Sequence, residues 1–329
     1  MKRGDTVPDP VARFHRDLIA AAGRSVADDE SVAIAVSGGP DSMAMLALAA
    51  AALPGRVIAA TFDHGLRGDS PAEAAMVAGW CVDRGIPHAT LHPPTPLPRA
   101  NIQAAARTAR YAALADWAGG HDARLLATAH HADDQAETFL MRANRGSGPA
   151  GLAGIRRRRT LAPGLDLVRP LLGWRRHDLA AIAATVPSVD DPSNRNIRFA
   201  RARWRGWLGQ QSLIDPAQLA RSAAHVAAVQ DDLDALRDWA WRERRQPGEA
   251  MAVDMAGLPR TLCRLLARTA IHRVRIDHGI VAPAFTDSTP IEALLDALAV
   301  GRGATQGGVM ATTRGSVWHF IPAPPRRTA

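Results

Sequence analysis

The chain has 329 residues, 47% of them hydrophobic and 22% charged, which is long enough for about two folded domains. Its formal net charge of +8, carried almost entirely by arginine, suits a polyanionic partner such as nucleic acid. The two isolated cysteines argue against zinc or iron–sulfur frameworks, and no signal-peptide core or membrane-length apolar run is present, so we expect a cytoplasmic protein with no membrane contact.

The first half of the chain alternates between predicted strands and predicted helices. Apolar runs predict strands at 32–36, 56–62, 86–92 and 124–129, and the intervening segments predict helices at 43–53, 71–84, 101–119 and 133–144. Such alternation is typical of a parallel sheet that is covered by helices on both faces. We therefore expect an α/β domain over residues 1–212.

The second half is predicted to be mainly helical. A segment rich in glycine and arginine, 146–170, reads as an exposed loop or hairpin and is followed by predicted helices at 175–184, 198–208, 217–245 and 259–277, with a turn at 190–194. Glycine-containing turns at 307–308 and 314–315 predict hairpins in the tail. We expect a smaller, mainly helical second domain over residues 213–329.

The most informative segment is Ser37-Gly38-Gly39-Pro40-Asp41-Ser42, between the first predicted strand and its helix. Unpaired N–H groups and the helix dipole favour an anion there, and the glycines let a phosphate approach the backbone. The segment lacks the lysine of the Walker phosphate loop, since the chain's one lysine is Lys2. It resembles instead the PP-loop of the ATP pyrophosphatases, which adenylate a substrate. A glycine-rich turn without a ligand is the weaker alternative.

Two further polar groups follow predicted strands. Asp63 and His64 come after the second strand, where an acidic residue can reach ribose hydroxyls and where a simple turn is the alternative. After the fourth strand, Asp134 and Glu137 are three residues apart at a helix start and share one face. Two converging carboxylates attract a cation, either Mg²⁺ or a substrate ammonium group.

His130 and His131 stand beside the predicted acidic pair. They are candidates for contacts with phosphate or with the reacting centre, and strand-end packing is the alternative. A zinc site is disfavoured because no H-E-x-x-H motif and no nearby cysteine is present.

Five segments in order resemble the tRNA(Ile)-lysidine synthetase family of PP-loop enzymes: SGGPDS, DHGLRG, TAHHADDQAETFLMRANRGSGPAGLAGI, RPLL and DDPSNRNIRFARARWR. The resemblance implies an adenine nucleotide alpha-hydrolase-like fold and an ATP-dependent ligase. ATP, with Mg²⁺, would adenylate the C2 oxygen of the wobble cytidine of tRNA(Ile) with a CAU anticodon. The ε-amine of L-lysine would then displace AMP and form lysidine.

The resemblance also implies roles for individual residues. ATP binding falls to Ser37, Gly38, Gly39, Pro40, Asp41, Ser42, Asp63 and His64, with Asp41 as a metal ligand. Lysine binding falls to Asp134 and Glu137, and the catalytic candidates are Asp41, His131, Arg201 and Arg203. Contacts with tRNA are expected from Arg156, Arg157, Arg158, Arg159 and Arg205, although a solvated basic surface is the alternative.

Other expectations concern the partner and the alternatives. We expect Trp204 and Trp207 to pack in the core rather than stack on bases, and the second domain to recognise the tRNA body. The oligomeric state stays open, with a homodimer as one option. A tRNA thiolase or an amide-forming synthetase is disfavoured by the missing cysteine pairs and glutaminase segments. A nucleotide sensor without chemistry would not need Asp134 and Glu137.

Overall fold

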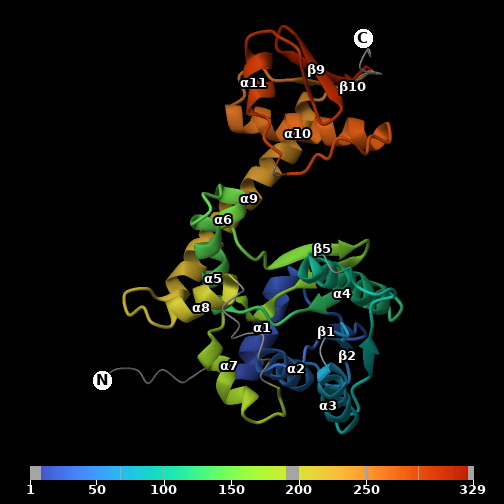
Figure 1. Cartoon of the computed structure of the whole chain (residues 1–329), viewed down its shortest axis with the longest axis vertical. Coiled ribbons are helices and arrows are strands. Elements are labelled where there is room, and N and C mark those ends of the chain that lie inside the picture. The colour runs from blue at the N-terminus through green and yellow to red at the C-terminus, as the bar shows by residue number, and fades with distance from the viewer. Residues whose placement is uncertain are drawn as a thin grey trace. The chain divides into compact units, whose positions relative to one another are not determined.

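The computed structural model describes residues 9–66, 68–98, 100–189, 200–248, 251–287 and 289–324. The chain divides into two compact units, Met1–Ala228 and Val229–Ala329 (Figure 1). The division falls inside the long helix α9 (Pro216–Arg244). The turn expected at 190–194 and the first two residues of the helix expected at 198–208 lie outside the described residues.

A six-stranded sheet forms the centre of the first unit, with the strand order β3-β2-β1-β4-β6-β5. Its parallel strands are β1 (Val32–Ala35), β2 (Val57–Phe62), β3 (His88–Leu91), β4 (Leu125–Ala127) and β6 (Leu165–Val168). The edge strand β5 (Arg158–Ala162) pairs antiparallel with β6. The predicted parallel sheet is therefore confirmed, and the glycine- and arginine-rich segment contributes a hairpin to its edge.

The sheet is buried on both faces, which explains why its strands read as continuous apolar runs. Val32 and Ile34 of β1 pack into one core with α1 (Pro10–Ala22), α2 (Pro40–Ala52), α3 (Ser70–Val82) and α7 (Arg176–Ala183). Ala33, which points to the opposite face, packs with residues of α4 (Ile102–Gly119). Further helices of this unit are α5 (Ala132–Ala143), the short α6 (Pro149–Leu152), the 3₁₀ turn η1 (Pro170–Gly173) and α8 (Ala200–Leu208).

The strand order determines where the polar segments meet. The chain builds β2 and β3 on one side of β1 and places β4 on the other side. The connections that leave β1 and β4 therefore diverge, and ligands of open α/β sheets bind in the crevice at such a point. The PP-loop follows β1, and residues 128–131 follow β4, so both predicted clusters lie at this crevice.

The second unit has a four-stranded antiparallel sheet in the order β7-β10-β9-β8. Its strands are β7 (Met251–Asp254), β8 (Ala304–Gln306), β9 (Val309–Arg314) and β10 (Val317–Pro322), and its helices are α10 (Arg260–Asp277), α11 (Glu292–Ala299) and the end of α9. Leu266, Leu295 and Phe320 are buried in their shared core. The two tail hairpins are confirmed. No helix in the described part of the chain is long and apolar enough to cross a membrane.

Candidate active site

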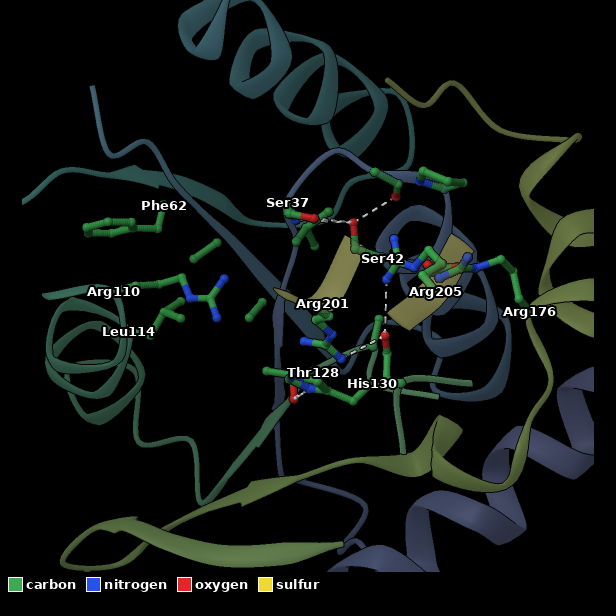
Figure 2. Close-up of a pocket in the computed structure, with 18 residues that line it drawn as sticks. Ser37, Ser42, Phe62, Arg110, Leu114, Thr128, His130, Arg176, Arg201 and Arg205 are labelled. Carbon is green, nitrogen blue, oxygen red and sulfur yellow. Dashed lines mark hydrogen bonds and ion pairs between the residues drawn. The ribbon is translucent and has the colours of Figure 1, made fainter. Parts of the chain in front are cut away.

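A cavity of about 550 Å³ opens at the carboxyl ends of β1, β2 and β4 (Figure 2). The PP-loop contributes Ser37, Gly39, Pro40, Asp41 and Ser42 to its lining. The other polar lining residues are Thr128, His130, Asp134 and the arginines Arg110, Arg176, Arg201 and Arg205. The phosphate loop and one member of the acidic pair therefore face the same space.

Hydrogen bonds within the PP-loop fix its conformation. The backbone N–H of Ser37 donates to Oγ of Ser42 over 3.1 Å, and the Ser42 hydroxyl donates to the carbonyl oxygen of Gly39 over 2.9 Å. Gly38 has a φ of +81°, a left-handed conformation that suits glycine. Helix α2 begins at Pro40 and no side chain caps its first turn, so this helix start is open to a phosphate.

His131 is fully buried behind the cavity, among three carboxylates. Its Nε2 lies 3.3 Å from Asp41 Oδ2 and 3.6 Å from Asp134 Oδ2, and its Nδ1 lies 3.6 Å from Asp133 Oδ2. Burial alone would lower the pKa of His131, but Asp133 and Asp41 outweigh burial and raise the pKa to about 9. The imidazole is therefore charged at neutral pH and orients Asp41 and Asp134. It does not line the cavity.

His130 lines the cavity and has the opposite charge state. Burial lowers its pKa to about 3, and Arg169 and Arg201 act in the same direction. Its Nδ1 lies 3.1 Å from Thr128 Oγ1. His130 is thus a neutral hydrogen-bonding group at physiological pH. Two adjacent histidines with pKa values so far apart are typical of a functional site.

The acidic pair on α5 is engaged by two arginines of α8. Arg201 donates from Nε to Glu137 Oε2 over 2.8 Å and from Nη2 to Asp134 Oδ1 over 3.0 Å. Arg205 donates from Nε to Glu137 Oε1 over 2.7 Å. Glu137 is only 2% exposed, whereas Asp134 reaches the cavity wall. The predicted cation-binding carboxylates already hold guanidinium groups.

Sequence reasoning missed two cationic residues of the lining. Arg110 reaches the cavity from α4, as Figure 2 shows, and Arg176 reaches it from the start of α7. Neither belongs to a recognisable motif. The only available signal for Arg110 is its place in an arginine-bearing helix that covers one face of the sheet.

Asp63 and His64 lie outside the cavity lining. Asp63 is buried at the end of β2, and its Oδ1 accepts a hydrogen bond of 2.8 Å from the N–H of Gly65. Nδ1 of His64 accepts one of 3.0 Å from the N–H of Leu66. Both side chains therefore form turns of the kind that the sequence left as the alternative.

Arg203 points away from the acidic pair because it lies between Arg201 and Arg205 on α8. It lines a different groove, with Trp204, Trp207 and Asn144. Trp207 is 41% exposed, so the expectation that it packs in the core is wrong. The two indole rings meet edge to face with their centroids 5.5 Å apart.

The arginine run 156–159 divides into two kinds of residue. Arg156 and Arg158 donate to the carbonyl oxygens of Ala227 and Ala22 and so take part in the packing of the first unit. Arg157, Arg158 and Arg159 are exposed, but Nε of Arg158 also lies 3.8 Å from Asp166 Oδ2. Only part of the run is therefore free to contact a polyanion.

The oxygen donors at the PP-loop fit a magnesium ion that binds together with a nucleotide. Within the described ranges, no group of three or more His, Cys, Asp or Glu side chains is placed to hold a metal. Asp41 keeps its side chain 30% exposed at the loop. In nucleotide sites Mg²⁺ commonly takes one or two carboxylates, with phosphates and water as the other ligands, and Asp41 can serve in this way.

Comparison with known proteins agrees with this site. Residues 11–212 match the family model of the PP-loop domain. The chain is 40% identical over 334 residues to the tRNA(Ile)-lysidine synthase of Novosphingobium aromaticivorans, which covers 99% of this chain and 97% of that protein. It is 38% identical to the enzyme of the same name from a Methylobacterium species, over 97% of this chain and 96% of that protein.

A solved structure of another protein shares the fold. The U34-tRNA thiolase NcsA from Methanococcus maripaludis superposes with a TM-score of 0.56 at 18% identity, over 67% of this chain and 79% of that chain. The predicted PP-loop fold is thereby confirmed. Since these two relatives match over nearly their whole length and the PP-loop domain spans residues 11–212, the chain belongs to the tRNA(Ile)-lysidine synthase family.

Proposed function

We propose that this protein ligates L-lysine to C2 of the wobble cytidine of tRNA(Ile) with a CAU anticodon, using ATP and releasing AMP and pyrophosphate. One observation supports this most directly: the PP-loop and Asp134 line one cavity, at the end of a sheet with a net basic rim. A nucleobase placed in this cavity would lie close both to the α-phosphate of an ATP bound at the PP-loop and to a lysine amine held by Asp134.

The PP-loop and the arginines serve the adenylation step. Ser37, Gly39 and Ser42 would cradle the ATP phosphates, and Asp41 would hold the accompanying Mg²⁺. That ion would neutralise phosphate charge when bound. Arg176, Arg201 and Arg205 face the same cavity and can stabilise the negative charge that develops on the α-phosphate. His131 is a positioning residue because it holds Asp41 and Asp134 from behind.

Asp134 and Glu137 serve the second step by holding an ammonium group of lysine. Arg201 and Arg205 occupy both carboxylates in this structure, so lysine binding requires a guanidinium group to release an oxygen. Phosphates of ATP or of the adenylate attract the same guanidinium groups. We propose that nucleotide binding draws Arg201 or Arg205 away and thereby opens the lysine site.

The attacking amine must be neutral. His130 is a weak candidate for the base, because a group with its pKa near 3 holds a proton poorly at neutral pH. It suits a hydrogen bond to the cytosine or to phosphate better. Asp63, His64 and Arg203 are proposed to act indirectly, by shaping the turn after β2 and the outer face of α8.

The second unit and the exposed arginines are proposed to hold the tRNA. The predicted second domain, residues 213–329, which includes this unit, would read parts of the tRNA outside the anticodon, since another tRNA with a CAU anticodon must be rejected. Arg157 and Arg159, and Arg205 at the cavity, would contact phosphates. We propose that the protein acts in the cytoplasm. Its oligomeric state is to be tested, with a homodimer as one option.

A ligation assay tests the function. Purified protein is incubated with radiolabelled lysine, ATP and an unmodified tRNA(Ile) transcript, and label in RNA is counted. We expect incorporation only when ATP is present, and none into a second transcript with a CAU anticodon. ATP binding without incorporation would support the sensor alternative, and sulfur transfer in place of lysine would support the thiolase alternative.

A further inference from the structure

A group of arginines surrounds Tyr111, at the edge of the cavity. The guanidinium carbons of Arg107, Arg110 and Arg159 lie 5.0, 5.2 and 5.0 Å from the centroid of the Tyr111 ring. Arg107, Arg110 and Tyr111 come from α4, and Arg159 comes from β5, about fifty residues later in the chain. A fourth arginine, Arg169, follows β6 and lies close to the same tyrosine. We call Arg107, Arg110, Arg159 and Arg169 the Tyr111 arginine cluster.

The cluster brings four positive charges together. Among the described residues, none of its four members forms an ion pair with a carboxylate, whereas Arg201 and Arg205 each hold two. Burial would raise the pKa of Tyr111, but Arg110 and Arg107 outweigh burial and lower it. The phenol thus lies in a concentrated positive field. Like charges gathered without compensation are typical of a surface that binds a polyanion.

Arg169 supplies an independent observation. Its side chain is only 3% exposed; Nη1 donates to the carbonyl oxygen of Arg156, whereas the buried Nε finds no acceptor among the described residues. Burial lowers the pKa of Arg169, and Arg159 and Arg107 act in the same direction. A buried guanidinium with an unused donor is costly to keep in a folded protein. An anion bound at the exposed Arg107 and Arg159 would relieve the repulsion that these residues exert on Arg169.

The cluster is continuous with the cavity but extends beyond it. Arg110 lines the cavity (Figure 2), whereas Arg107 and Arg159 are exposed and do not. A free nucleotide seated on the PP-loop would lie in the cavity, which Arg107 and Arg159 do not line. A chain molecule with one base in the cavity would carry its neighbouring phosphates across them.

We propose that the Tyr111 arginine cluster binds backbone phosphates of the RNA strand whose nucleobase enters the cavity, with Tyr111 as the aromatic support for the guanidinium groups. This inference rests on the proposed function for the identity of the RNA. The chemistry of recognition is charge-assisted hydrogen bonding from guanidinium groups to phosphate, without reading of base sequence.

The test uses three variants of the cluster: Arg107→Gln, Arg159→Gln and the double variant that carries both changes. Arg84→Gln is the control variant. Arg84 is a matched control because it is exposed and its guanidinium also lies on an aromatic ring, 4.1 Å from the Trp80 centroid, but it does not line the cavity. Binding of unmodified tRNA(Ile) is measured by fluorescence anisotropy at several salt concentrations, and ATP binding is measured by calorimetry. The double variant should reduce the slope of log K against log salt by about 1.4, roughly 0.7 for each lost contact.

The outcomes separate the sources of phosphate. Arg84→Gln should keep the wild-type slope, and all variants should bind ATP within about twofold of wild type. An unchanged salt slope in the double variant overturns the proposal. If ATP affinity is lost while the slope stays the same, the cluster binds the nucleotide and not the RNA. Wild-type protein that shows the predicted slopes but ligates no lysine would overturn the proposed function and leave the cluster in place.

Discussion

Lysine should bind much more tightly when nucleotide phosphates occupy the PP-loop. Arg201 and Arg205 make four hydrogen bonds to Asp134 and Glu137, with lengths of 2.8, 3.0, 2.7 and 3.3 Å. An incoming ammonium group must replace one of these guanidinium groups, unless a phosphate has already attracted it. Both arginines line the cavity that holds the PP-loop, so a bound phosphate is close enough to do so.

The size of this coupling follows from the contacts that are broken. A hydrogen bond to a charged group contributes about 1.5–3 kcal/mol, and couplings between sites are typically about 1–3 kcal/mol. We therefore expect a non-hydrolysable ATP analogue to lower the Kd for lysine by roughly 10- to 100-fold, at about 1.4 kcal/mol per factor of ten. Linkage requires lysine to tighten binding of the analogue by the same factor.

Calorimetric titration of lysine, with and without the analogue, measures the coupling directly. Arg205→Met removes the guanidinium that Glu137 Oε1 accepts from, so this variant should bind lysine more tightly without nucleotide and show a smaller coupling. Identical lysine affinities with and without the analogue would refute the proposed release of the arginines. Leucine in place of lysine serves as the control ligand, since it lacks the ammonium group on its side chain.

Three other perturbations address separate parts of the site. Asp134→Asn should reduce lysine transfer by about 100- to 1,000-fold, which corresponds to the loss of a buried charge pair, while the rate of pyrophosphate release stays near normal. Equal losses in both steps would contradict the assignment of Asp134 to lysine binding. The double variant Arg157→Ala/Arg159→Ala should flatten the salt dependence of tRNA binding. The double variant Arg156→Ala/Arg158→Ala should mainly lower the melting temperature, because it removes two hydrogen bonds to backbone carbonyl groups. If both double variants show the same phenotype, the four arginines act as a unit. The pKa of His131 is raised to about 9 from 6.5, so its contribution to stability is complete below pH 6.5 and is lost as pH rises through 9. The unfolding free energy of the wild type should therefore fall by on the order of 3 kcal/mol across this pH range, and that of His131→Gln should not. Denaturant titrations measure both values; if they depend on pH in the same way in the two proteins, His131 does not stabilise the fold through its charge.

The sheet and the phosphate loop could be predicted because their signals are local. Residues 32–36 are apolar throughout, as expected for a strand covered on both faces, and β1 covers Val32–Ala35. Glycines and serines that follow such a strand and precede a helix are typical of a phosphate-binding loop. The shared cavity then follows from one topological fact, that polar residues at the ends of neighbouring parallel strands meet at one edge.

The arginines of the site could be predicted only in part. Arg201 and Arg205 are four residues apart, so helical periodicity alone places them on one face and Arg203 on another. Their pairing with Asp134 and Glu137 depends instead on α8 packing against α5, a contact between segments about sixty residues apart. Arg110 and Arg176 carry no local signal, because any exposed helix of a basic protein has similar residues.

The histidine pair shows most clearly why sequence neighbours need not share a role. His130 and His131 stand where the chain leaves β4 in an extended conformation, and successive side chains of such a segment point in opposite directions. One direction leads to the cavity wall, where burial, with Arg169 and Arg201 acting in the same direction, keeps His130 neutral. The other leads into the protein, to Asp41, Asp133 and Asp134, which keep His131 charged. The two carboxylates that face the proposed metal and lysine are therefore held by a cation that never touches the cavity, and a change at His131 should alter the chemistry only through them.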